Sequence, residues 1–444
     1  MSDAEQVRSE GISYQELIKA DVVAPPKTLT LENPYQTSIT SVPVTRYTSK
    51  AFHDLEMQKL WPKVWQMACR EEEIPEVGNH VVYDIGHYSI IVVRTESGIK
   101  AHHNVCRHRG RRLCDRDGHA ASFICPFHGF SWHLDGSLRG ITSEWDFPHI
   151  DKDNFTLTPL LCDTWGGWVF INMDLDAEPL ASYLGDLPEH FAVWKPEERY
   201  IEAHVAKVMS CNWKLCQEAF MEAFHVIHTH PQILVGIGDE NSQYDVWGNF
   251  SRAITPNGTP SPHLRRQPSE QEMFEAITMR NLDDPPAPEI PEGVSARGAM
   301  AATARAGLQP IVGEDTPISD ACVSDSIYYT VFPNFHPWGG YNRIVYRFRP
   351  FDNRHDKSIM ECYYLSPFAD ERPDPAPIHW LDEDQPWTDA PELGMLAKVF
   401  TQDTFNLPKV QLGLEAAQYD DVMLANYQET KIRHFHTLLA EFIR

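Results

Sequence analysis

The chain has 444 residues, of which 42% are hydrophobic and 23% charged, and it carries a formal net charge of −25 at pH 7. This acidic balance argues against binding to nucleic acids or to anionic membranes, because both need a basic surface. No run of eighteen apolar residues occurs, so we expect no membrane-spanning helix. The first residues lack the basic and apolar blocks of a secretory signal, which indicates a cytoplasmic protein whose nine cysteines stay reduced.

Residues 1–63 form an N-terminal arm that we expect to pack on the C-terminal domain. A short helix is predicted around residues 13–19. A second helix begins at Thr48 or Ser49, either of which can cap its first turn. The apolar face of this second helix comprises Phe52, Leu55, Leu60 and Trp61.

Residues 64–172 contain short apolar segments separated by turn residues such as Gly86 and Gly98. The segments are 64–68, 80–84, 88–93, 99–102 and 168–172. Short segments bounded by turns, with apolar and polar side chains in alternation, are typical of antiparallel strands. We therefore expect an all-β domain over residues 64–172.

Two short loops within this domain each contribute one cysteine and one histidine: Cys106 with His108, then Cys125 with His128. Two thiolates and two imidazoles can hold a structural zinc ion, or a [2Fe–2S] cluster in which two histidines replace two cysteines on one iron. A zinc finger supplies a cysteine pair followed by a histidine pair, whereas each loop here supplies one residue of each kind. The interleaved spacing favours the cluster, with both thiolates on one iron and both imidazoles on the other.

The residues around these loops agree with an iron–sulfur site. Gly110, Pro126 and Gly129 allow tight loops whose backbone N–H groups can point at sulfur, which tunes such clusters. The arrangement resembles the Rieske domain, and the similarity continues through residues 130–136, which match the strand and turn after the second loop in that family. The resemblance implies a [2Fe–2S] cluster bound by Cys106, His108, Cys125 and His128.

A basic run, Arg107, Arg109, Arg111 and Arg112, accompanies the first loop of this acidic chain. These arginines either pair with nearby carboxylates and carbonyl groups or form a docking patch for an acidic electron carrier. The two interpretations are compatible with each other.

Longer elements follow Pro179, and the most informative stretch spans residues 212–231. A helix is predicted from Trp213 to about Ile227. Glu218, Glu222 and His225 would then lie on one face of it, because they are spaced by four and three residues.

Two further histidines compete as partners of His225. Helical spacing slightly favours His228, which follows three residues later. His230 precedes Pro231, and a residue before proline is pushed out of the helical region, so His230 can turn back from the end of the helix.

This stretch resembles the catalytic domain of Rieske non-haem iron oxygenases, in which an acidic residue is followed after two residues by histidine and after four more by a second histidine. Glu222, His225 and His230 match that spacing. The resemblance implies a mononuclear Fe(II) bound by His225 and His230, and a 2-His-1-carboxylate set with open positions suits an iron that activates O2.

The third ligand must be a carboxylate from far along the chain. The candidates are Asp382, Asp384, Asp389, Asp403, Asp420 and Asp421. In the family the carboxylate precedes a Val-Gln-x-Gly-Leu segment by seven residues, and Asp403 precedes residues 410–414 in this way. The resemblance therefore selects Asp403.

The family also gives Glu222 a role of its own. In the family an acidic residue at this position bridges a cluster histidine of one subunit and an iron-ligating histidine of the next, within a trimer. By position Glu222 would link His225 to His128 or His108 of a neighbouring chain. A carboxylate suits this role because it accepts N–H groups from both imidazoles. The alternative is an exposed helical glutamate without such a function.

The sequence departs from the family near these residues. Ala219 stands where asparagine is frequent, Phe224 where tyrosine is frequent, and Gln402 where glutamate often precedes the third ligand. Ring-hydroxylating dioxygenases commonly carry aspartate at the position of Glu222, and the long N-terminal arm resembles the branch with quaternary-amine monooxygenases. These differences bear on the substrate and not on the metal sites.

Residues 253–320 are rich in proline, glycine, alanine and charge, and we expect an irregular insertion that covers a substrate pocket, with one amphipathic piece at residues 269–279. Strands are predicted at residues 326–332, 341–348 and 358–365, and an amphipathic terminal helix at residues 429–442. The expected fold class is α+β, with an all-β Rieske domain and, over residues 173–444, a helix-grip-like catalytic domain containing a curved antiparallel sheet.

The resemblance implies the terminal oxygenase α subunit of a Rieske system. Such a protein activates O2 at Fe(II) with electrons from the cluster, and inserts one or two oxygen atoms into an aromatic or other bulky hydrophobic molecule. The expected partners are a ferredoxin or flavin reductase that draws on NAD(P)H, two further copies of the chain in a trimer and, in some members, a β subunit.

Other functions stay open at this point. The same iron can demethylate an amine or methyl ether or cleave a C–N bond. A zinc-stabilised binding protein without redox function is the alternative from another class. The length of the chain and its second set of histidines and carboxylate count against a pure electron carrier.

Overall fold

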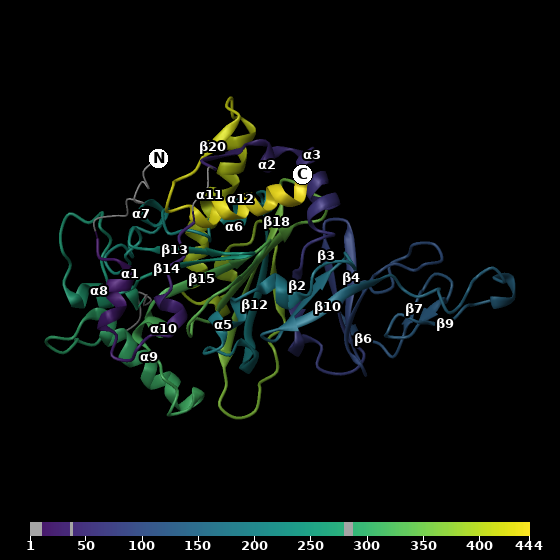
Figure 1. Ribbon diagram of the computed structural model, residues 1–444, viewed down its shortest axis with the longest axis horizontal. Helices are drawn as coiled ribbons and strands as arrows, with labels where there is room; N and C mark the ends of the chain where they lie inside the picture. The colour runs from purple at the N-terminus through teal and green to yellow at the C-terminus, as the bar shows by residue number, and fades with distance from the viewer. Residues whose placement is uncertain (1–10, 36–38, 279–286) are drawn as a thin grey trace.

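The computed structural model describes residues 11–35, 39–278 and 287–444, and in it two β-sheets lie side by side (Figure 1). The first, antiparallel throughout, has seven strands. In spatial order these are β2 (Gln66–Arg70), β11 (Trp168–Asn172), β10 (Pro159–Trp165), β5 (Gly98–His103), β4 (Tyr88–Thr95), β3 (Asn79–Ile85) and β6 (Gly118–His119).

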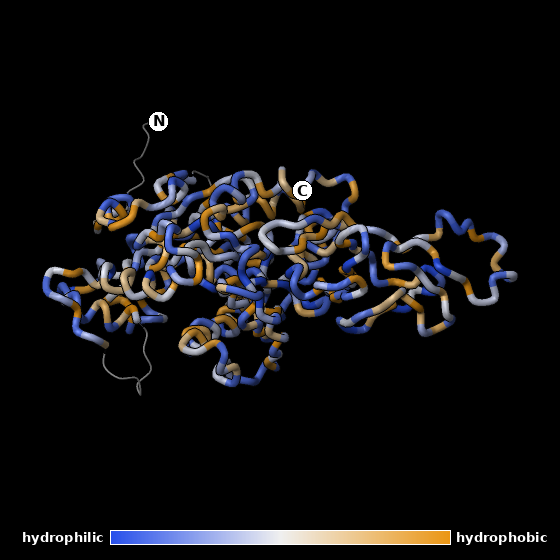
Figure 2. The backbone as a smooth tube through the Cα atoms, turned by 90° about the horizontal axis from the view of Figure 1, so that it is seen from below, coloured by the Kyte–Doolittle hydropathy of each residue, from blue (hydrophilic) through white to orange (hydrophobic). Residues whose placement is uncertain are grey.

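A three-stranded sheet extends from this part as a narrow end of the molecule. Its strands are β7 (Phe123–Ile124), β8 (Ser131–Trp132) and β9 (Leu138–Gly140). Figure 1 shows this extension at the right, and Figure 2 shows it again after the molecule is turned by 90°. The small sheet therefore protrudes from the rest of the chain.

Strand β4 connects the small sheet to the main core because both of its faces are buried. Ile90 and Val92 pack in the largest hydrophobic cluster, whereas Ile91 and Val93 pack in a second cluster. The alternation follows from the two-residue period of a strand. The second cluster also contains Cys106 and Cys125, so β4 fixes the protruding end to the body.

The second large sheet has eight strands and is antiparallel except for the pair β12 and β19. In spatial order its strands are β13 (Gln243–Trp247), β14 (Phe250–Thr255), β15 (Ser326–Val331), β16 (Phe335–Pro337), β17 (Ile344–Pro350), β18 (Ser358–Pro367), β12 (Arg199–Met209) and β19 (Ile378–Leu381). With its curled sheet and mixed helices, the structure confirms the predicted α+β class.

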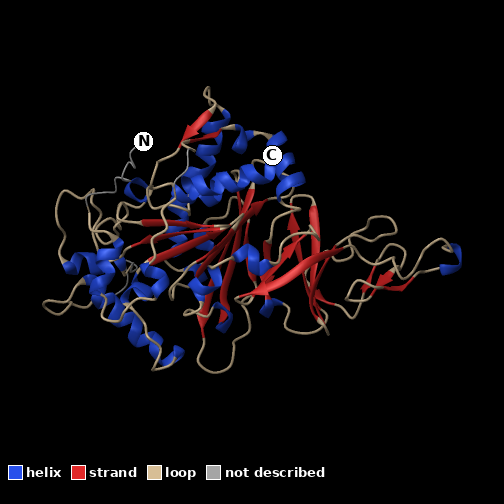
Figure 3. Ribbon diagram, in the orientation of Figure 1, coloured by secondary structure: helices blue, strands red, loops and turns tan. Residues whose placement is uncertain are grey.

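Helices α11 (Leu396–Glu415) and α12 (Thr430–Ile443) cover one side of this sheet (Figure 3). Phe400 and Leu407 of α11 pack with Tyr346 and Cys362 of the sheet in one hydrophobic cluster. Helix α12 confirms the predicted amphipathic terminal helix. Its buried face packs against β13 and β14 at one edge of the sheet.

The N-terminal arm confirms both predicted helices. The first is α1 (Tyr14–Leu17), and the second is α3 (Lys50–Leu55), for which the side chain of Ser49 accepts a hydrogen bond from the N–H of Phe52. The arm's remaining elements are η1 (Ile18–Ala20), η2 (Lys27–Thr30), β1 (Ser41–Pro43), which pairs with β20 (Asp421–Met423), α2 (Thr45–Thr48) and the π-helix η3 (Glu56–Leu60).

The prediction that the backbone of residues 253–320 is irregular is wrong. The segment contains α8 (Glu270–Ile277), α9 (Ala296–Val312) and α10 (Asp320–Ser324). Helix α9 was missed because Gly298, Gly307 and Pro310 lower its helix propensity, and packing overrides that propensity. Residue 279, the end of the predicted amphipathic piece, lies outside the described residues.

The remaining short helices connect these parts: η4 (Glu71–Glu73), η5 (Glu144–Asp146), α4 (Leu180–Leu184), α5 (Leu187–Phe191), η6 (Pro196–Glu198), α6 (Trp213–Glu218), α7 (Val226–Thr229), η7 (Trp387–Asp389) and η8 (Pro391–Leu393). Among the described residues, no helix has both the length and the apolar character that crossing a membrane requires.

Candidate metal centres

The two Cys/His loops lie together at the protruding end. Cys106 and Cys125 are buried in one hydrophobic cluster, and the ring centroids of His108 and His128 are 4.7 Å apart. Burial raises the pKa of the Cys106 thiol, as does the neighbouring Cys125 thiol, whereas the backbone N–H of His108 lowers it. The structure thus brings all four predicted residues into one place, with the thiols inside and the imidazoles outside.

Both loops close in the same way. The N–H of Gly110 donates to the carbonyl of Cys106 at 2.9 Å, and the N–H of Gly129 donates to the carbonyl of Cys125 at 2.9 Å. The glycines have φ angles of 76° and 77°, a region that residues with a Cβ atom rarely adopt. Glycine therefore permits each loop to turn its cysteine and histidine toward the same point.

The imidazoles show that this point suits a bound group. The Nδ1 atoms of His108 and His128 are buried, and neither has a hydrogen-bond partner in the described part of the chain. Buried polar atoms without a partner are rare in folded proteins, so a ligand is the natural partner for these two. Two buried thiols and two unpartnered Nδ1 atoms fit a [2Fe–2S] cluster with mixed ligands.

The basic run beside the first loop serves mostly local contacts. The partners are the carbonyl groups of Asn154 and Thr156 for Arg107, the carboxylate of Asp115 for Arg111 and that of Asp84 for Arg112. Arg109 instead lies over the ring of Phe127, 5.2 Å from its centroid. Local pairing therefore accounts for three of the four arginines.

A second candidate centre lies in the part of the chain that contains the eight-stranded sheet. His225, His230 and Asp403 each offer a ligand atom, and these atoms all lie within 4.8 Å of one another. Nε2 of His230 is 2.6 Å from Oδ1 of Asp403, and Nε2 of His225 is 3.5 Å from the same oxygen. His228, the competing partner, is exposed and lies outside this group.

The local backbone differs from the predicted continuous helix over residues 213–227. Helix α6 ends at Glu218, and α7 begins only at Val226. One reason is that the N–H of His225 donates to Glu222 Oε2 at 3.0 Å. This side-chain hydrogen bond replaces the bond to a backbone carbonyl that the N–H would form in a continuous helix. The prediction that Glu218, Glu222 and His225 share a helical face is therefore wrong, although Glu222 and His225 do meet.

The outer nitrogens of both histidines are held by side chains. His225 Nδ1 donates to Glu222 Oε1 at 2.7 Å, and His230 Nδ1 donates to Gln402 Oε1 at 2.9 Å. The same Gln402 oxygen accepts a hydrogen bond from Gln232 at 2.9 Å. With Nδ1 of each ring bonded to these outer partners, both Nε2 atoms point toward Asp403, where they can ligate a metal once they carry no proton.

The charges around this point favour a cation. Burial opposes protonation of His225, but the carboxylates of Glu222 and Asp403 raise its pKa to about 10. Burial raises the pKa of Asp403, yet hydrogen bonds from His225 and His230 lower it below its ordinary value overall. Two imidazoles and one carboxylate, held by outer partners, fit the donor set of a mononuclear Fe(II) site.

Glu218 belongs to a different site from the one its spacing predicted. It is buried, and its carboxyl group contacts the hydroxyl of Tyr47 at 3.0 Å and Nε2 of His436 at 2.9 Å. Burial raises its pKa to about 8. Tyr47 and His436 lie far from Glu218 in the sequence, so no local signal could have found this cluster.

A cavity of about 660 Å³ lies close to the second centre. Leu396 and Val399 of α11 line it, as does Ile233, three residues after His230. Val399 precedes Asp403 by one helical turn, about 6 Å along the axis at 1.5 Å per residue. Two lining residues thus stand within four residues of His230 and Asp403, although none of the three candidate ligands is itself among the lining residues. The volume is in the range of small-molecule sites.

Comparison with known families agrees with these features. Residues 191–444 match the family model described as ring hydroxylating alpha subunit (catalytic domain), and residues 64–149 match the Rieske [2Fe-2S] domain. The chain belongs to the family of ring-hydroxylating oxygenase alpha subunits. The two domains carry a Rieske cluster and a mononuclear iron in this family.

Curated relatives include monooxygenases and dioxygenases. The chain is 32% identical over 196 residues to the glycine betaine monooxygenase oxygenase subunit of Pseudomonas aeruginosa, covering 44% of this chain and 46% of that one. It is 32% identical over 203 residues to the biphenyl 2,3-dioxygenase subunit alpha of Rhodococcus jostii, covering 44% of each. The matched region thus spans about half the length of these relatives.

Solved structures share the fold over almost the full chain. A quaternary ammonium Rieske monooxygenase, studied for carnitine oxidation by gut microbiota, superposes with a TM-score of 0.65 and 18% identity over 91% of this chain and 96% of that one. Naphthalene 1,2-dioxygenase from Rhodococcus sp., bound to indole, gives a TM-score of 0.62 and 20% identity over 91% and 94%. At this identity the likeness concerns the fold.

Proposed function

We propose that the chain is the terminal oxygenase component of a Rieske system, which hydroxylates a bulky organic molecule with O2. The observation that carries the proposal is the presence, in one chain, of a cradle for a [2Fe–2S] cluster and a separate 2-His-1-carboxylate site next to a cavity. When bound, the cluster supplies single electrons and the Fe(II) ion supplies a site for O2 reduction.

The geometry supports one assignment of the ligands. Cys106, His108, Cys125 and His128 would hold the cluster, and His225, His230 and Asp403 would hold the iron. Glu222 and Gln402 keep the protons of His225 and His230 on Nδ1. The proposed domains are the arm at residues 1–63, the cluster domain at residues 64–172 and the catalytic domain at residues 173–444.

We also propose that electrons pass between neighbouring chains of a trimer. Strand β7, which leads into the second cluster loop, and helix α7, which lies between the iron-ligating histidines, are in different parts of the molecule (Figure 1). Each part exposes large apolar side chains: Phe127 is 55% and Trp145 82% exposed near the cluster loops, and Phe405 is 67% exposed two residues from Asp403. Such surfaces favour contact between copies.

Glu222 is the proposed bridge in that contact. Each of its carboxylate oxygens already accepts one bond from His225, at 2.7 Å and 3.0 Å, and a carboxylate oxygen has a second lone pair. His108 or His128 of a neighbouring chain can donate to it. A ferredoxin or reductase in the cytoplasm would reduce the cluster, and Arg109 beside Phe127 can contribute to its docking.

A single-turnover reaction tests the proposed function. The cluster-reduced, iron-loaded protein is mixed with 18O2 and a panel of aromatic acids, neutral aromatics and quaternary amines, and the products are analysed by mass spectrometry. A product with one or two 18O atoms supports a hydroxylating oxygenase. An N- or O-demethylated product indicates the alternative activity, and the absence of any oxygenated product from loaded protein contradicts the proposal.

A further inference from the structure

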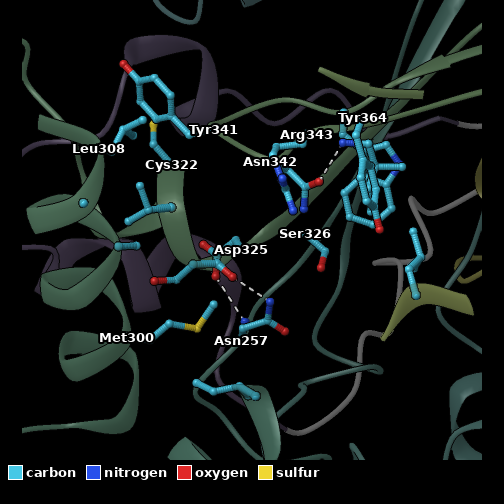
Figure 4. Close-up of a pocket in the computed structure, with 18 of the residues that line it drawn as sticks. Asn257, Met300, Leu308, Cys322, Asp325, Ser326, Tyr341, Asn342, Arg343 and Tyr364 are labelled. Atoms are coloured by element: carbon cyan, nitrogen blue, oxygen red, sulfur yellow. Dashed lines mark hydrogen bonds between the residues drawn. The ribbon is translucent and has the colours of Figure 1, made fainter. Parts of the chain in front are cut away.

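The cavity beside the second centre has one apolar side and one polar side. Met300 and Leu308 of α9 lie on one side, and Arg343, Asn342 and Tyr364 lie on the other (Figure 4). A cavity of about 660 Å³ is large for a single ring. The apolar side matches a bulky hydrocarbon body, and the polar side can recognise one end of it.

Asp325 cannot recognise a cationic end, although it lines the cavity. Both of its oxygens accept hydrogen bonds from the buried guanidinium of Arg297, and Oδ1 also accepts the N–H of Asn257 at 3.1 Å. Its side chain is 0% exposed. A buried carboxylate that already forms an ion pair with two bonds has little attraction left for a second cation.

Two of the three aromatic side chains that line the cavity, Tyr341 and Tyr364, do not offer free rings for a quaternary ammonium ion. The third, Trp338, packs on Tyr328 with ring centroids 5.3 Å apart. The guanidinium of Arg343 lies 4.8 Å from the ring centroid of Tyr364, and that of Arg199 lies 5.7 Å from the ring centroid of Tyr341. Two of the rings that line the cavity thus already have a cation at one face. A cationic ligand next to them would meet like charge.

Arg343 is the charged group of the wall with donors to spare. Its Nη1 donates to Glu202, and in the described part of the chain no hydrogen bond joins its Nε or Nη2 to a protein acceptor. A guanidinium has five N–H donors in a planar fork that matches a carboxylate. The side chain of Arg343 is 46% exposed, so it lies at an open side of the cavity.

We propose that this cavity binds a bulky apolar carboxylic acid, with its carboxylate on Arg343 and its hydrocarbon body against α9 and toward Asp403. The inference rests on the proposed oxygenase function and names the substrate class of that site. Asn342 and Ser366, which also line the cavity, add polar atoms near the same end. Ile233 and Val399, which are close in sequence to His230 and Asp403, also line this cavity.

Calorimetric titration of the iron-loaded protein tests the proposal without any turnover. The probes are three acids of increasing size, benzoate, biphenyl-4-carboxylate and pyrene-1-carboxylate, each compared with its primary amide and its trimethylammonium analogue. We expect at least one acid to bind tenfold or more tightly than both of its analogues, because a charge-assisted bidentate contact is lost in the amide and replaced by repulsion in the ammonium.

Two variants test whether Arg343 causes the preference for the acid. In Arg343→Gln the affinity for the acid should fall at least tenfold, while that for the amide changes less than twofold. In Glu202→Gln the affinity for the acid should rise, because the competing carboxylate on Arg343 is removed. Arg354→Gln is the matched control, since Arg354 is exposed, pairs with Asp356 and does not line the cavity.

Three results would overturn the inference: no acid binds, an ammonium probe binds most tightly, or neither Arg343→Gln nor Glu202→Gln changes the affinity for the acid. Circular dichroism shows whether each variant is folded. If one variant does not fold, the affinity of the other for the acid still tests the inference, because the two variants should change this affinity in opposite directions. Selective acid binding without any product in the single-turnover reaction would contradict the oxygenase function but leave the binding inference standing.

Discussion

The two candidate centres are built in different ways. The cluster cradle consists of two loops that are close in sequence, and each loop closes on itself through a glycine N–H and a cysteine carbonyl. The mononuclear site combines a broken helical segment at residues 219–230 with Asp403, which is 173 residues after His230. A local site depends on its own loops, whereas a distant one depends on the packing of α11 against the sheet.

Replacement of Asp403 by alanine separates the two centres most strongly. Asp403 is the group that contacts both histidines, so its loss should abolish binding of the mononuclear iron and all turnover. The cluster should remain, because its cysteines pack in a different hydrophobic cluster from α11. Iron analysis and the visible spectrum measure both effects, with exposed Asp420→Asn as the control. Retained turnover in Asp403→Ala would direct attention to Asp420 or Asp421.

Replacement of Glu222 tests the link between the centres. Glu222→Ala removes the acceptor of His225 Nδ1 and the proposed bridge to the neighbouring chain. Outer partners of this kind are worth about 10-fold to 100-fold in activity, so we expect both metals to stay and electron transfer to slow by at least that factor. Stopped-flow reoxidation of the reduced cluster measures it. Near-normal reoxidation would eliminate the bridging role.

Replacement of Gln402 tests how His230 is positioned in the mononuclear site. Gln402→Leu removes the acceptor that holds the proton on His230 Nδ1, and we expect about tenfold weaker iron binding with an unchanged cluster. Competition with a chelator measures the affinity. Gln232→Leu is the matched control because Gln232 contacts Gln402 and not the ring. Equal affinity in the two variants would mean that Gln402 does not position His230.

Glu218 concerns the stability of the protein and neither metal centre. Burial raises its pKa in the folded state to about 8, above the ordinary value of 4.5, so the folded state binds the proton more tightly than the unfolded state. Its contribution to stability is therefore complete below pH 4.5 and is lost as the pH rises to about 8. The free energy of unfolding of Glu218→Gln, relative to the unmodified protein, should increase with pH by at most about 1.4 kcal/mol per unit over this window.

Denaturant unfolding at pH 6 and pH 8 measures this difference. Glu441→Gln is the control, since Glu441 is exposed at the end of α12. A difference between Glu218→Gln and the unmodified protein that does not change with pH would show that the folded state ionises Glu218 without cost.

The contrast between the centres also explains what the sequence could predict. The cluster residues stand in two short motifs, and His225, His230 and Asp403 were found because their spacing matches a family pattern. The break between α6 and α7 could not be predicted, because it depends on bonds from Glu222 and Tyr244 to the backbone of residues 223–225. Periodicity alone favoured His228, which the structure leaves exposed.

Other parts depend on contacts between distant residues. Helix α9 escaped prediction because glycine, proline and alanine in its sequence are compatible with a loop, although an insertion that covers a pocket was expected at these residues. The hydrogen bonds between Gln402 and His230 and between Glu218 and His436 each join residues that are more than 170 positions apart in the sequence. Such pairs follow from the fold and not from any local pattern.

The content of iron, zinc and acid-labile sulfide per chain, together with the visible spectrum, tests the central claim most directly. The sum of one [2Fe–2S] cluster and one mononuclear site predicts about three irons and two sulfides with no stoichiometric zinc. About two irons and two sulfides would support the cluster but leave the site of His225, His230 and Asp403 without its metal. Zinc without sulfide would contradict the account and leave a zinc-stabilised binding protein.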